Sequence, residues 1–139
     1  MKIIENCWDQ IETYNCQYGA HIFEGSIAKI YVNHWLDVAP EMVRLFSRRN
    51  DEGFVGHCIL AFFGVKNFKF SVRQWGMQGE KTVWREPVDF CYEGVEAGRL
   101  ISYEFEGSLH GFPSSVFVAI EAERFELHVL DNDEPARQS

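Results

Sequence analysis

Two runs of alternating residues constrain the fold of this chain more than any other feature of its sequence. The runs span residues 99–106 and 116–130, and a turn-like segment, SLHGFPSS, lies between them. Over residues 101–106 and 124–129 of these runs, the apolar side chains fall on every second position: Ile101, Tyr103, Phe105, Phe125, Leu127 and Val129. The positions between these are polar or charged: Ser102, Glu104, Glu106, Arg124, Glu126 and His128. A period of two places the two sets on opposite faces of a sheet, so we expect antiparallel strands with one buried face and one hydrated, acidic face.

Other segments also have the composition of strands. Residues 57–65 (HCILAFFGV) are apolar on both faces, which is typical of a central strand that is covered on both sides. Residues 68–75 (FKFSVRQW) alternate, and only a short turn separates them from the first segment, so we predict that the two form a hairpin. Residues 26–33, 82–84 and 88–92 are further strand candidates, and Pro87 separates the last two.

Two segments have a different pattern. Residues 5–17 place Trp8, Ile11 and Asn15 at helical spacing, which predicts a short helix in the N-terminal segment 1–19. Residues 41–48 (EMVRLFSR) fit either a helix that begins at Pro40 or a strand. We favour the strand because the neighbouring segments on both sides are strand-like.

The predicted fold is therefore mainly β, an antiparallel β-sandwich or a strongly curved sheet with a short N-terminal helix; the α+β class stays open as the alternative. A chain of 139 residues is long enough to bury the core of a single domain, 1–139. Its 46% hydrophobic residues and 12 phenylalanines exclude a disordered chain. Residues 131–139 (DNDEPARQS) are expected to form a flexible acidic tail.

The sequence carries no signal for export or for a membrane. No apolar run is long enough to cross a bilayer, and the first sixteen residues lack the pattern of a signal peptide. The four cysteines, Cys7, Cys16, Cys58 and Cys91, include no CxxC pair. We therefore expect a cytoplasmic protein with reduced thiols and no membrane partner.

Established catalytic and metal-binding motifs are absent from the sequence. None of the five histidines has another ligand at zinc spacing, and there is no HExxH, GxSxG or phosphate-binding loop. His110, in the turn beside the acidic strand, is the most plausible functional histidine. We predict no catalytic residue, no metal ligand and no cofactor, and hence a protein that is not an enzyme. A small enzyme or ligand-binding protein with a pocket in the curved sheet remains the alternative.

The charge distribution favours a basic protein partner. The net charge is −8, and residues 91–139 hold ten Asp and Glu against three Arg and no Lys. This balance argues against nucleic acid, whose phosphates require a basic surface. Glutamates that lie opposite one another on adjacent strands repel, and a basic partner would relieve that repulsion.

Trp75 and Trp84 flank a glycine-bearing loop, where tryptophans are often anchors for a partner. The predicted partner-binding residues are Glu104, Glu106, Glu121, Glu123, Glu126, Trp75 and Trp84. A homo-oligomer that buries such aromatics is a third interpretation.

The order of several segments also resembles a group of known families. These segments are CWDQI, YGAHIFEGSIAKIYV, LAFFGVKNFKF with its Phe63-Gly64-Val65 turn, LISYEFEG and VAIEAERFELHVL. Together they are similar to small β-rich bacterial families found among the immunity proteins of polymorphic toxin systems, and to their uncharacterised relatives. The resemblance implies a non-enzymatic protein that binds and neutralises a toxin domain.

Overall fold

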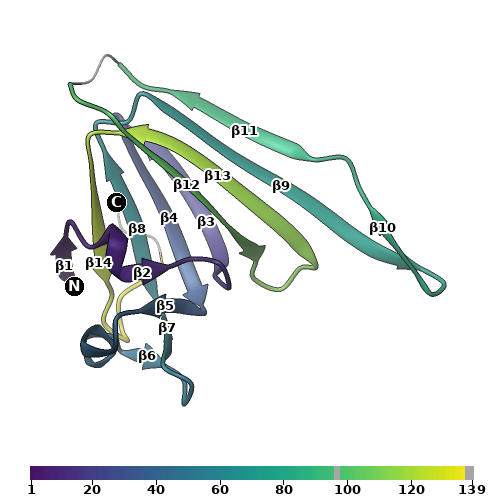
Figure 1. The fold of residues 1–139 in the computed structure, drawn as a ribbon, viewed down its shortest axis with the longest axis horizontal. Coiled ribbons are helices and arrows are strands. Elements are labelled where there is room, and N and C mark those ends of the chain that lie inside the picture. The colour runs from purple at the N-terminus through teal and green to yellow at the C-terminus, as the bar shows by residue number, and fades with distance from the viewer. Residues whose placement is uncertain (96–97, 137–139) are drawn as a thin grey trace.

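A computed structural model describes residues 1–95 and 98–136. Ten of the strands in these ranges form one bent sheet (Figure 1). They are β1 (Lys2–Glu5), β3 (Gln17–Glu24), β4 (Ile27–His34), β8 (Cys58–Phe63), β9 (Asn67–Gln78), β10 (Lys81–Trp84), β11 (Val88–Glu93), β12 (Ile101–Leu109), β13 (Ser114–Ala122) and β14 (Arg124–Val129). Their order is β1-β14-β8-β4-β3-β12-β13-β9-β10, with β11 also paired to β9. All these pairs are antiparallel except β3 with β12, so the mainly β prediction is confirmed.

A small second sheet lies near one end of the large one, at the lower left of Figure 1. Its order is β2-β5-β7-β6. These strands are β2 (Ile11–Glu12), β5 (Leu36–Val38), β6 (Arg48–Arg49) and β7 (Phe54–Gly56). Two short 3₁₀ helices, η1 (Trp8–Gln10) and η2 (Pro40–Leu45), complete the elements of the described ranges.

The bent sheet folds into two layers, β14-β8-β4-β3 and β12-β13-β9-β11, with the apolar core between them. Trp8 joins the layers: its ring centroid lies 5.0 Å from that of Phe125 in the first layer and 5.2 Å from that of Phe105 in the second. Phe62 and Phe105 stack across the same interface, with centroids 5.8 Å apart. Edge and offset contacts of this kind add to the free energy of apolar burial, so these aromatic rings hold the sandwich together.

One corner of the sandwich is closed by a close approach of β3 and β12. The hydroxyl of Tyr18 donates to the carbonyl oxygen of Glu106 at 2.8 Å. The Tyr18 ring lies directly over Gly107, where an added Cβ would come within 2.4 Å of a ring carbon. A residue without a side chain is therefore required at this crossing of the layers.

The predicted N-terminal helix is wrong. Within residues 5–17, only Trp8–Gln10 are helical, as the single 3₁₀ turn η1, and Ile11–Glu12 form the strand β2, in which Ile11 pairs with Val38. A helix this short is marginal by itself, and here the extended chain can bury Ile11 and pack the partly buried Trp8 against partners distant in sequence. The preference for a strand over residues 41–48 is wrong for Glu41–Leu45, which belong to η2, with Pro40 at its first position.

The predicted hairpin between residues 57–65 and 68–75 is also wrong. Strand β8 lies between β4 and β14, whereas β9 lies in the other layer beside β13. Gly64, with φ of +64°, begins the crossing, and the amides of Val65 and Lys66 donate to Ser26 and Glu121, one in each layer. The short turn therefore connects the layers instead of pairing two neighbouring strands.

The prediction that β8 is covered on both faces is confirmed. Its inward side chains lie in the main core. Its outward side chains, Ile59 and Ala61, join Tyr31 and Leu130 in a second apolar cluster, with Phe63 against it.

The alternation predicted for residues 101–106, at the start of β12, is confirmed at five of these six positions. Tyr103 and Phe105 are buried, and Ser102, Glu104 and Glu106 are exposed. Ile101 was expected to be buried but is 49% exposed, because it opens β12 at the margin of the sheet. In β14, Phe125, Leu127 and Val129 are buried as predicted.

The predicted tail, residues 131–139, lies only partly within the described ranges, because residues 137–139 are outside them. Within 131–136, Asp131 and Glu134 form ion pairs with the N-terminal ammonium at 3.1 and 3.2 Å.

Neither η1 nor η2, the helices of the described chain, has the length and apolar content to cross a membrane.

Candidate interaction surface

The outer face of β12, β13, β9 and β11 is open to solvent and strongly acidic. The strand register arranges its side chains in three rows across the sheet. The middle row is Glu104, Ala119, Lys69 and Cys91; the flanking rows are Ser102, Glu121, Asn67 and Glu93, and Glu106, Phe117, Ser71 and Asp89. We call the carboxylates of these rows, Asp89, Glu93, Glu104, Glu106 and Glu121, the acidic face. They surround one lysine, so the face is negatively charged as a whole.

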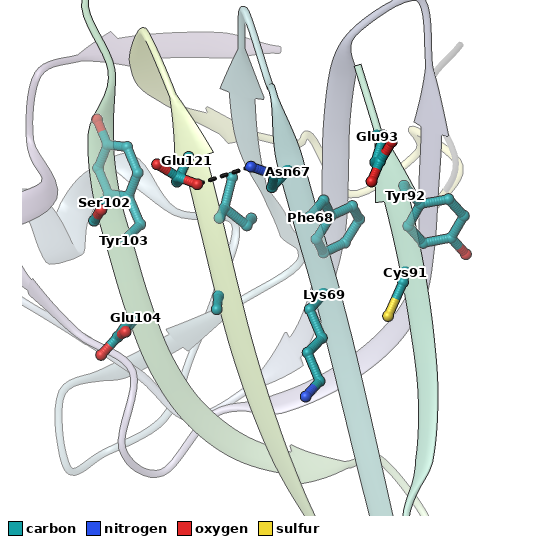
Figure 2. Close-up of a pocket in the computed structure, with 12 residues that line it drawn as sticks. Asn67, Phe68, Lys69, Cys91, Tyr92, Glu93, Ser102, Tyr103, Glu104 and Glu121 are labelled. Atoms are coloured by element: carbon teal, nitrogen blue, oxygen red, sulfur yellow. Dashed lines mark hydrogen bonds between the residues drawn. The ribbon is translucent and has the colours of Figure 1, made fainter.

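A shallow pocket of about 400 Å³ lies within the acidic face (Figure 2). Ala119 lies at the base of the pocket, because its side chain is shorter than those of Glu104 and Lys69, its neighbours on the adjacent strands. The amide of Asn67 donates to Oε1 of Glu121 at 2.8 Å, which fixes that carboxylate against β9. Lys69 forms an exposed ion pair with Asp89 at 3.7 Å. Glu104 and Glu93 lie on strands at opposite sides of the pocket and do not converge.

Three of the five predicted glutamates lie together on this face: Glu104, Glu106 and Glu121. Glu123 lies in the connection between β13 and β14, where its Oε1 accepts the backbone N–H of Gly98 at 3.2 Å. It therefore caps the end of the sandwich. The sequence pattern could not separate Glu123 from Glu121, because both occupy odd positions of one apparent strand.

The expectation that Glu126 faces water is wrong. Glu126 lies on β14 in the other layer and is 8% exposed. It forms an ion pair with Arg124, and its Oε1 lies 2.9 Å from Nε2 of the buried His128. Burial raises the pKa of Glu126, but the hydrogen bonds from His128 and Arg124 outweigh burial and hold the pKa below its ordinary value. The outer side of β14 is covered at Glu126 and His128, and Glu126 pairs with both His128 and the exposed Arg124.

Trp75 and Trp84 lie opposite each other on a two-stranded ribbon that projects from the body of the protein (Figure 1). The ribbon begins beyond Gln74 of β9, because Gln74 pairs with Ser114, the first residue of β13. The two indole rings are 6.3 Å apart, and the guanidinium of Arg73 lies 5.2 Å from the centre of the Trp84 ring. Trp84 is 43% exposed. Both tryptophans share the outer side of β9 with Arg73, so the ribbon continues the surface that carries the acidic face.

Sequence reasoning missed several members of this surface. Asp89 and Glu93 join it because β11 pairs with β9. Phe117 and Met77 are 43% and 59% exposed on the same side. The period of two could have found Phe117, because a pattern that points Glu121 outward also points Phe117 outward.

The remaining histidines and cysteines are dispersed over residues 1–95 and 98–136. No group of three or more His, Cys, Asp or Glu in these ranges is placed to hold a metal ion. All four cysteines are free thiols, and only Cys91 is exposed. His110 lies at the end of β12, where its ring is 5.2 Å from that of His34. His21 is stacked on Phe70 at 4.3 Å, and its Nε2 lies 2.9 Å from the hydroxyl of Tyr92.

Comparisons of this chain with protein-family models, with curated proteins and with solved structures found no match.

Proposed function

We propose that this chain is a non-enzymatic protein-binding domain that receives a basic surface of another protein on its acidic face. The observation that supports this most directly is the open sheet surface on which five carboxylates surround Lys69. Like charges on neighbouring strands destabilise one another, and a basic partner relieves that repulsion. The same field attracts a basic partner before contact and raises its association rate.

Exposed aromatic side chains supply the apolar part of the interface. Phe117 lies in the row of Glu106, and Trp84 lies further along the same side of the sheet. Aromatic residues of this kind carry much of the binding free energy in protein interfaces, whereas charged residues mainly set rate and specificity. The acidic face would therefore steer the partner, and Phe117 and Trp84 would anchor it.

The resemblance to immunity-protein families indicates a toxin domain as the partner. The charge of the acidic face requires the contact surface of that domain to be basic. Toxins that act on nucleic acids present such a surface, because they bind phosphates. Blocking that surface is sufficient for neutralisation and needs no catalytic residue in this chain.

A ligand-binding protein is the second candidate, favoured by the pocket of about 400 Å³ on the same face. Its lining includes Glu93, Glu104 and Glu121, so the ligand would be a cation. The walls are shallow and open, however, whereas small-molecule sites bury most of the surface of their ligand. We therefore give priority to a protein partner.

The test measures association rates with a candidate partner, taken from the adjacent gene or from a pull-down, over a series of salt concentrations. The double variant Glu104→Lys with Glu106→Lys reverses two exposed charges on the acidic face. We expect a fall in association rate of about tenfold or more at low ionic strength, and a smaller difference at high salt. The free energy of unfolding should change by less than about 0.5 kcal/mol, because both side chains point to water.

The matched control is Glu12→Lys with Glu24→Lys, which makes the same change in net charge at two exposed positions outside the acidic face. A rate that responds equally to both double variants would reflect net charge alone and would contradict the proposed surface. A rate that responds neither to salt nor to the reversal at Glu104 and Glu106 would contradict it as well.

A further inference from the structure

The small sheet carries a pocket of about 570 Å³ whose wall contains two arginines. Arg48 and Arg49 of β6 line it together with His34, Trp35, Asn50 and Phe54. No aspartate or glutamate is among its described lining residues. In a chain with a net charge of −8, a cavity whose charged lining residues are both arginines is unexpected from composition. We call this cavity the arginine pocket.

The positive charge of the arginine pocket is not neutralised within the described chain. Neither Arg48 nor Arg49 forms an ion pair with any carboxylate of residues 1–95 or 98–136. His34 also lines the pocket, and its ring centroid lies 5.2 Å from that of His110. Burial lowers the pKa of His34, and the nearby His110 and Arg48 lower it further, so the neutral imidazole is favoured. The arginines therefore carry the positive charge of the pocket, without an ion-pair partner in the described ranges.

Local hydrogen bonds and a close backbone approach define two parts of the pocket wall. The side chain of Asn50 accepts the backbone N–H groups of Glu52 and Phe54 at 2.9 and 3.0 Å, which fixes the loop after the arginines. Gly56 forms part of the lining, and a Cβ there would lie 2.1 Å from the carbonyl oxygen of Asn33. Position 56 therefore tolerates no side chain, because a Cβ there would collide with the backbone of Asn33.

An aromatic wall completes the arginine pocket. Trp35 has a φ of +70°, a left-handed conformation that bulky residues rarely adopt. This conformation places its ring 5.0 Å from that of Phe54, at a tilt of 52°. Arg48 pairs with Gly56, so it leaves β6 on the side of Gly56 and Phe54, whereas Arg49 pairs with Val55 and leaves the strand on the other side. The pocket thus combines the Arg48 side of β6 with an aromatic pair, and Arg49 borders it.

We propose that the arginine pocket is a binding site for a small phosphate monoester that carries a flat ring. Guanidinium groups match phosphate geometry with paired hydrogen bonds, and they stay charged at every physiological pH. Arg48, on the side of Phe54, would take the phosphate oxygens, Arg49 at the border would add to the positive potential, and Trp35 with Phe54 would contact the ring. The site is built from strands other than those of the acidic face, so it is independent of the function proposed above.

The experiment uses the full chain labelled with ¹⁵N and follows the backbone amides of residues 34, 35, 48–50 and 54–56. The probes are inorganic phosphate, adenosine monophosphate and adenosine. We expect saturable shifts of these amides with both phosphate-bearing probes, and tighter binding of adenosine monophosphate. Adenosine alone should bind much more weakly, because it lacks the anionic group. Shifts that map elsewhere, or an absence of saturation with both phosphate probes, would overturn the proposal without any variant.

Two variants then separate the site from general charge effects. Arg48→Gln with Arg49→Gln should weaken binding of adenosine monophosphate by about tenfold or more. Arg44→Gln is the control, because Arg44 is exposed on η2 nearby but does not line the pocket. Equal weakening by the double variant and by the control would also overturn the proposal. If the double variant does not fold, the single variants Arg48→Gln and Arg49→Gln take its place.

Discussion

Nε2 of His128 lies 2.9 Å from Oε1 of Glu126, and both side chains are buried on the same side of β14. Arg124, two residues earlier on the strand, pairs with the other carboxylate oxygen. Positions 124, 126 and 128 therefore form a local charge network along one strand. The network lets β14 carry charged residues on its outer side although that side is covered.

This network predicts a pH-dependent stability. The folded-state pKa of Glu126 lies below its ordinary value of 4.5, so its stabilising contribution is present above that value and is lost as the pH falls through the folded pKa. Glu126→Gln should lower the free energy of unfolding by about 1 to 3 kcal/mol near neutral pH. The difference from the wild-type chain should shrink as the pH falls below the ordinary value of 4.5 and through the folded-state pKa. Urea unfolding over a pH series measures both, and a difference that shrinks at no pH below 4.5 at which the chain stays folded would contradict the assignment.

A buried hydrogen-bond chain ties the C-terminal segment to β4. The hydroxyl of Tyr31 lies 2.6 Å from Nδ1 of His57, and Nε2 of His57 lies 2.8 Å from the carbonyl oxygen of Asp131. Because a carbonyl only accepts, Nε2 donates to Asp131, and Nδ1 is left to accept the hydroxyl proton of Tyr31. Tyr31→Phe should therefore destabilise the protein by about 1 to 3 kcal/mol, because it leaves a buried acceptor unpaired. Tyr14→Phe, at a position that is 74% exposed, is the control and should leave the urea midpoint unchanged.

Trp8 and Trp84 should respond very differently to truncation. Trp8 contacts four aromatic rings of the core, whereas Trp84 lies on the projecting ribbon. Trp8→Ala should cost about 3 to 5 kcal/mol, because it leaves a cavity between the layers. Trp84→Ala should change the free energy of unfolding by less than about 0.5 kcal/mol, because the exposed ribbon adds little to the cooperative core. A large loss of stability in Trp84→Ala would show that the ribbon packs on the body in solution.

The four thiols should separate into one reactive and three protected groups. Burial raises the pKa of Cys7 to about 11 and that of Cys16 to about 12, and it raises the pKa of Cys58 as well. Cys91 is exposed on the acidic face. Alkylation of the native protein followed by mass spectrometry should therefore modify Cys91 alone, and denaturant should release the other three. Rapid modification of the Cys91→Ser variant would contradict this placement.

Local periodicity predicted the inward and outward sides of individual strands. Tyr103 and Phe105 point to the core and Glu104 and Glu106 to water, because successive side chains of any strand leave opposite faces of a sheet. The burial of β8 on both faces was predictable for a similar reason, since an apolar residue at every position leaves no polar side to hydrate. These properties belong to single segments, and their composition is sufficient to determine them.

The partners of each segment were decided only by the tertiary structure. Residues 57–65 and 68–75 adjoin in sequence but lie in opposite layers, because β8 pairs with β14 and β9 pairs with β13. Glu121 and Glu126 have the same alternating pattern, yet one faces water and the other is buried beside His128. The arginine pocket likewise brings His34 to Arg48 through the pairing of short strands. Alternation along a strand repeats every two residues and is visible locally, whereas the cover over each face comes from residues far away in the chain.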